Sequence, residues 1–168
     1  MSWKPVRPKD GHAGFTLIEL VVVIGAVALV MAILMLGVRR ASDAFSLRRA
    51  ATVVTSELRR AQASAVSGAV DYTVEFQVTS PYQVTVYRQT TAVRAVSGQE
   101  WPSSVTIRSD PESTVPFCTT PGSVTNKCVT FRPLGFANAG GVVQLRSRTG
   151  VTVNVAVTAA TGRVSVQP

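Results

Sequence analysis

The sequence predicts an α+β protein, in which a long N-terminal helix packs against an antiparallel β-sheet or sandwich head. An uncharged apolar run extends from Leu20 to Val38, and apolar residues in Ala41–Val66 recur at spacings of three and four, as in a helix. From Asp71 onward the apolar period changes to two, which is typical of strands. The chain is therefore divided into four predicted segments: 1–14, 15–38, 39–68 and 69–168.

The apolar run is long enough to cross a bilayer. As a helix, its roughly 19 residues would span about 28 Å, close to the thickness of the hydrocarbon core. The preceding segment carries Lys4, Arg7 and Lys9 against a single acid, Asp10. Because basic flanks stay on the cytoplasmic side, we expect a single-pass inner-membrane protein whose C-terminal head is exported.

A cleaved secretory signal peptide and a plain membrane anchor are the two simpler interpretations. The run is longer than the hydrophobic region of a signal peptide, and Arg39 and Arg40 follow it in place of a small-residue cleavage site. A plain anchor has no use for Glu19, whose carboxylate costs a few kcal/mol inside a membrane. The first turn of a helix lowers this cost, but Glu19 still needs a partner.

The stretch Gly14-Phe15-Thr16-Leu17-Ile18-Glu19, placed after a basic leader and before a spanning segment, resembles the type IV pilin and pseudopilin family. The resemblance implies that 1–14 is a leader, cut between Gly14 and Phe15 by a prepilin peptidase. Phe15 would then be N-methylated. Glu19 would pair with the N-terminal amine of a neighbouring subunit during filament assembly.

The amphipathic segment is predicted to bury one stripe, and Ser67-Gly68 is predicted to end the helix. No proline interrupts Leu17–Val66, which favours one continuous rod. The buried stripe consists of Leu47, Ala51, Val54, Leu58, Ala61 and Ala65, and the opposite face of Arg48, Arg49, Glu57, Arg59 and Arg60.

Eight strands are predicted after the helix, with no helical pattern between them, so the sheet is expected to be antiparallel. They are Tyr72–Val78, Tyr82–Arg88, Ala92–Val96, Val105–Arg108, Val129–Arg132, Val142–Arg146, Val151–Val157 and Arg163–Val166. A long loop, Ser109–Lys127, carries Cys118, and Cys128 follows it directly, just before the next predicted strand. In an oxidising compartment such a pair forms a disulfide.

Neither a metal nor a cofactor is expected. The two cysteines are too few and too widely spaced for a zinc site, and His12, the single histidine, lies in the leader. The sequence also lacks a nucleophile elbow and a Gly-rich phosphate loop, so an exported enzyme is the least favoured class.

Three further segments resemble the pseudopilin H and FimT-like minor pilin group. They are Leu58–Ala65 at the helix end, Phe131–Gly135, and Thr161–Val164 near the C-terminus. The resemblance implies a structural subunit of a type II secretion pseudopilus or a type IV pilus, with other pilin subunits, the prepilin peptidase and the inner membrane as partners.

The alternative function is DNA binding, as in FimT-like minor pilins of DNA uptake. The chain has a net charge of +8, of which about +6 belongs to the mature part. Those pilins carry Gly-Arg-x-Arg at the C-terminus, whereas Gly162-Arg163-Val164-Ser165 lacks the second arginine. Arg146 and Arg148 could substitute if the strands bring them beside Arg163. Otherwise all three are solvated strand-end arginines, which is the favoured interpretation.

Overall fold

The computed structural model describes residues 15–97, 100–109, 111–119 and 125–167. His12, Gly14 and the rest of the predicted leader therefore lie outside the described residues. The chain forms two units, Met1–Arg39 and Arg40–Pro168. In the described part, one helix, α1 (Leu17–Gly68), precedes eight strands, which confirms the predicted α+β class.

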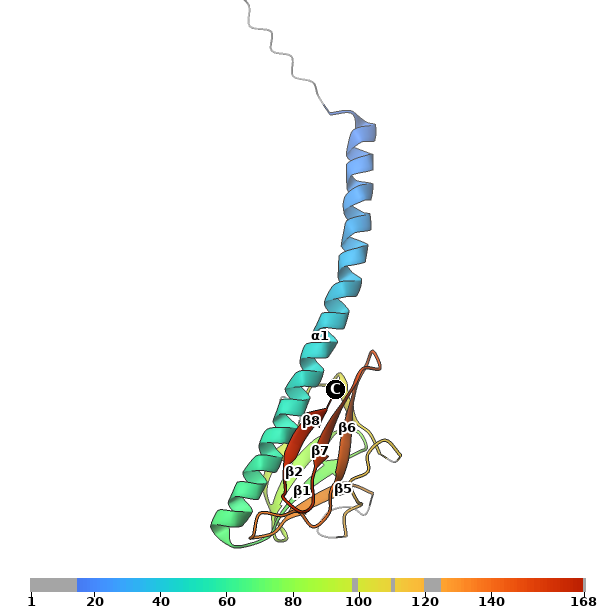
Figure 1. The fold of residues 1–168 in the computed structure, drawn as a ribbon. Helices are drawn as coiled ribbons and strands as arrows, with labels where there is room; N and C mark the ends of the chain where they lie inside the picture. The colour runs from blue at the N-terminus through green and yellow to red at the C-terminus, as the bar shows by residue number, and fades with distance from the viewer. Residues whose placement is uncertain (1–14, 98–99, 110, 120–124, 168) are drawn as a thin grey trace, which may run out of the picture. The chain divides into compact units, whose positions relative to one another are not determined.

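Within the second unit, α1 buries the predicted stripe. All six of its apolar residues are at most 3% exposed, and they join strand residues in one apolar core. Figure 1 shows this part of the helix, coloured teal to green, running beside the strands. The helix ends at Gly68 as predicted, and the next residue, Ala69, takes the left-handed conformation (φ 50°).

The prediction for the opposite face of α1 is wrong at Glu57. Arg48, Arg49, Arg59 and Arg60 are exposed, but Glu57 is only 5% exposed. Its Oε1 accepts a hydrogen bond from Arg94 Nε at 2.7 Å. Helical spacing alone does not place a carboxylate inside, because burial of this charge depends on a cation supplied by a strand.

The eight strands overlap the eight predicted segments and form two four-stranded antiparallel sheets. One sheet has the order β3-β2-β1-β5, and the other has the order β4-β6-β7-β8. The first comprises β1 (Tyr72–Gln77), β2 (Gln83–Arg88), β3 (Thr91–Val96) and β5 (Lys127–Phe131). The second comprises β4 (Val105–Ile107), β6 (Gly141–Ser147), β7 (Thr152–Val157) and β8 (Val164–Gln167).

The register between β1 and β5 separates an apolar face from a polar one. Val74 lies opposite Val129, and Glu75 lies opposite Cys128. Directly opposed residues of antiparallel strands share a face, and successive residues alternate between faces. Val74 and Val129 belong to the apolar core, so Glu75 and Cys128 lie on the other face of the sheet.

Candidate functional site

Thr16 caps the N-terminus of α1 directly beside the predicted cleavage point. Its Oγ1 accepts a hydrogen bond from the backbone N–H of Glu19 at 3.3 Å. This is half of a capping box, the Thr-x-x-Glu pattern in which a hydroxyl satisfies one of the unpaired amides of the first turn. The sequence analysis missed this role, although the four-residue pattern was available to indicate it. The cap fixes Glu19 in the first turn, where the helix dipole favours a carboxylate.

Leu17–Met35 is long and apolar enough to cross a membrane, with a mean hydropathy of 3.0 over 19 residues. None of this segment is buried within the chain, and Phe15, which precedes it, is also exposed. An apolar helix of this kind requires lipid or other apolar helices around it. The segment lies within the predicted range 15–38, and Glu19 is the acidic residue of its first turn.

A disulfide joins Cys118 and Cys128, whose Cα atoms are 4.9 Å apart. Two backbone hydrogen bonds flank the bond: Cys118 N–H donates to the Asn126 carbonyl, and Cys128 N–H donates to the Pro116 carbonyl. The segment before Cys118 thus lies along β5, which is one of the two outer strands of its sheet. Covering an outer strand in this way protects its backbone groups from pairing with another chain.

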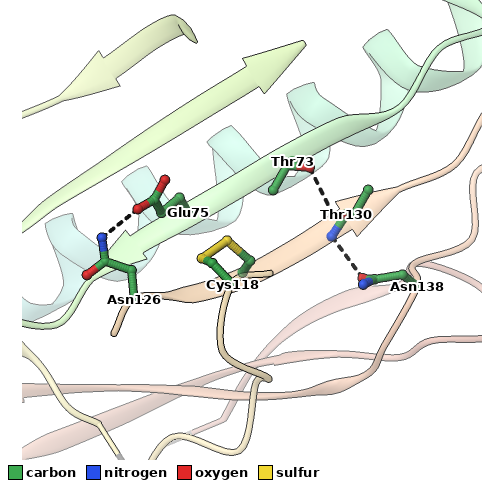
Figure 2. Close-up of a disulfide and its surroundings, with 7 residues drawn as sticks. Thr73, Glu75, Cys118, Asn126, Thr130 and Asn138 are labelled. Carbon is green, nitrogen blue, oxygen red and sulfur yellow. Dashed lines mark hydrogen bonds between the residues drawn. A yellow bond between two sulfur atoms is a disulfide. The ribbon is translucent and has the colours of Figure 1, made fainter. Parts of the chain in front are cut away.

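A polar cluster lies beside the disulfide on the same face of the sheet. Figure 2 shows the side chain of Asn126 pointing toward Glu75, and Asn126 Nδ2 donates a hydrogen bond to Glu75 Oε1. Burial, and secondarily the charge and hydrogen bond of Glu75, raise the pKa of Tyr87 above its ordinary value. Both Glu75 and Asn126 are buried, so these two side chains interact with each other inside the head and offer no open site.

Glu75, Cys118 and Cys128 also bring three metal-ligand atoms within 4.8 Å of one another. Zinc binds cysteine as thiolate, and a sulfur held in a disulfide is not a thiolate. In the described structure both cysteines are in the disulfide, so this set does not fit a metal.

The arginines of the DNA-binding alternative are not brought together. Arg146 lies opposite Thr152 at one end of the β6–β7 pair, and Arg148 follows in the turn. Arg163 precedes Val164, which lies opposite Val157 at the other end of β7. At ~3.3 Å per residue, about 20 Å of strand separates the two positions. The hypothesis that Arg146 and Arg148 substitute beside Arg163 is therefore wrong, because an antiparallel register sends them to opposite ends.

Two of the remaining cations act within the head. Lys127 is buried, with its Nζ 3.8 Å from the centre of the Phe117 ring. A hydrogen bond from Arg108, with smaller contributions that include the charge of Arg146, lowers the pKa of the Glu112 carboxyl. Both cations thus contribute to the head's own interactions.

Gln62 is a positioning residue that the sequence analysis also missed. Its Nε2 donates to the Gly135 carbonyl at 2.7 Å and to the Thr161 carbonyl at 3.2 Å. The helix thereby holds the two turns that the resemblance had singled out, Phe131–Gly135 and Thr161–Val164. A lone Gln between apolar stripe residues gives no sequence signal for contacts 73 and 99 residues away.

Comparison with known proteins gives two findings. A family model described as the prokaryotic N-terminal methylation motif matches residues 9–35. The fold is similar to the crystal structure of the type IV minor pilin FimU from Pseudomonas aeruginosa, with a TM-score of 0.54 and 15% identity. The match covers 73% of this chain and 88% of that one. No curated protein matches by sequence.

Proposed function

We propose that this chain, which carries the N-terminal methylation motif of prokaryotic pilins and has a fold similar to that of a type IV minor pilin, is a minor pilin or pseudopilin. It is a non-enzymatic structural subunit of a type IV pilus or of a type II secretion pseudopilus. The observation that carries this proposal is the combination of the motif with an unburied apolar helix and an α+β head. The motif covers only the N-terminus, and the head independently has the expected fold.

Processing begins at Gly14. A prepilin peptidase cuts the bond between Gly14 and Phe15 at the cytoplasmic face of the inner membrane, and Phe15 is then N-methylated. The mature chain waits in the membrane with its N-terminus inside and its head exported. Its apolar helix leaves the lipid only for an environment that is equally apolar, namely the packed helices of a filament.

Glu19 makes the transfer of the apolar helix from the membrane into the filament selective. Its carboxylate lies in the first turn of α1, where it is exposed in the isolated chain. The new N-terminal amine of a neighbouring subunit supplies the opposite charge, and a pair formed in an apolar medium is much stronger than one in water. A subunit that fails to form the pair keeps an isolated charge among apolar helices, which disfavours its incorporation.

DNA binding is not proposed. Its motif lacks the second arginine, and the separation of Arg163 from Arg146 and Arg148 removes the cluster that was to replace it.

Sheared filaments from cells that carry the complete machinery test the proposal. We expect them to contain this chain beginning at Phe15, with one methyl group added, as measured by intact mass. Replacement of Glu19 by Ala should strongly lower incorporation while cleavage at Gly14 continues. The matched control is Glu100→Ala, which removes an exposed acid of the head. A chain that begins at Met1, or that is absent from filaments, contradicts the proposal.

A further inference from the structure

The outward face of α1 in the head carries two pairs of arginines. Arg48 and Arg49 form one pair, Arg59 and Arg60 form the other, and all four are exposed. The pairs are 11 residues apart, which corresponds to about three turns and about 17 Å, so they point to the same side of the helix. Within the described residues, none of the four takes part in an ion pair.

Among the described residues of the head, almost every carboxylate is already paired or buried, so few can oppose this positive face. Ion pairs within the head occupy the carboxylates of Glu57, Asp71, Glu100 and Glu112. Glu75 is buried beside Asn126. Asp43 is the one carboxylate of the described head outside these interactions. A second copy of the chain would therefore meet this face with like charge, which destabilises the contact.

We infer that the face formed by Arg48, Arg49, Arg59 and Arg60 binds an acidic surface of a different filament subunit. The inference rests on the proposed function, because packed helices bring neighbouring subunits to α1. The positive charge of the chain then disfavours a filament made only of identical copies. The same charge favours insertion of the chain beside an acidic subunit.

The same face carries apolar side chains, which favours a protein partner over a polyanion such as DNA. Phe45 precedes Arg48 by three residues and is 70% exposed. Val66 follows Arg48 by five turns and is 53% exposed. Aromatic residues with arginine are enriched in protein interfaces. The small residues Thr52 and Ser56 lie between the arginine pairs, so a partner can approach the helix closely.

A photoreactive amino acid at Ser56, in the full-length chain and in cells with the complete machinery, tests the inference. After the filaments are sheared, mass spectrometry identifies the peptide that is cross-linked. We expect a peptide rich in Asp and Glu from another subunit that carries the methylation motif. The same probe at Val151, an exposed residue of the β6–β7 turn, is the control for position.

Charge removal provides the second measurement. Exposed ion pairs contribute about 0.2–1 kcal/mol each, so the double variant Arg48→Gln, Arg59→Gln should lower cross-linking roughly 2- to 30-fold per chain in the filament. The matched double variant Arg146→Gln, Arg148→Gln should leave it unchanged. Cross-linking to a second copy of this chain, to DNA, to lipid or to nothing overturns the inference while leaving the proposed function intact. Absence of the wild-type chain from filaments overturns both.

Discussion

Replacing Gly162 by Ala should destabilise the head more than the same change at Gly150. Both glycines have a left-handed backbone, with φ +62° and +89°, and the methyl group costs about 1–2 kcal/mol at either position for that reason alone. At Gly150 the nearest atom to the added Cβ is Arg146 Nη2, at 3.7 Å, so the methyl group has room. At Gly162 the Cβ would overlap both the Gly135 carbonyl oxygen and Gln62 Nε2.

The additional loss of stability at Gly162 arises because the side chain of Gln62 must move to make room for the methyl group. Gln62 would lose its hydrogen bonds to Gly135 and Thr161, which are worth roughly 0.5–1.5 kcal/mol each. We therefore expect the free energy of unfolding to fall by about 2–5 kcal/mol for Gly162→Ala and by about 1–2 kcal/mol for Gly150→Ala.

Urea unfolding of the mature chain in detergent, followed by the fluorescence of Trp101, measures both values. Trp101 is buried, and its Nε1 donates to the Val105 carbonyl at 2.9 Å, so its emission reports on the core. In a Gln62→Ala background, Gly162→Ala should cost less, because one of the two overlaps is gone. Equal costs at the two glycines, or an unchanged cost in that background, would refute the reasoning.

Three further predictions concern other contacts. Replacing Cys118 and Cys128 together by Ser should lower the free energy of unfolding by about 2–3 kcal/mol, because the unfolded chain gains the entropy of an open loop of roughly 10 residues. Incorporation into filaments should be unchanged, and a loss of incorporation would show that the loop contacts a partner. Arg94→Ala should lower the free energy of unfolding in urea by roughly 1–2 kcal/mol more than Glu57→Gln does. The reason is that Arg94→Ala leaves the buried carboxylate of Glu57 unpaired, whereas Glu57→Gln removes that charge. Thr16→Ala removes the cap of α1 and should lower helicity at its N-terminus, which is measured as faster amide hydrogen exchange at Glu19. Thr16→Ser keeps the hydroxyl and should leave this exchange unchanged, so equal exchange in the two variants would exclude the cap.

The sequence by itself determined most of the secondary structure of this protein. The helical stripe from Leu47 to Ala65 and the eight strand segments could be predicted from the sequence. The spacing at which side chains return to the same face of a helix or strand depends on local backbone geometry alone. The N-terminal motif could be recognised from the sequence for a related reason. Gly14 to Glu19 is a continuous stretch, and its relation to the following apolar run is set by sequence distance.

Only the tertiary structure decided which residues distant in sequence meet. Glu57 is on the polar side of the helical pattern, yet it is buried, because Arg94 arrives from β3 to neutralise it. Gln62 looked unremarkable, yet it holds two turns that follow β5 and β7. Arg146 and Arg163 are both near strand ends in the sequence, and the register of β6, β7 and β8 places them at opposite ends of the sheet. Alternation shows which face of a strand a residue occupies, but the choice of neighbouring strand and its direction depends on the packing of the whole core.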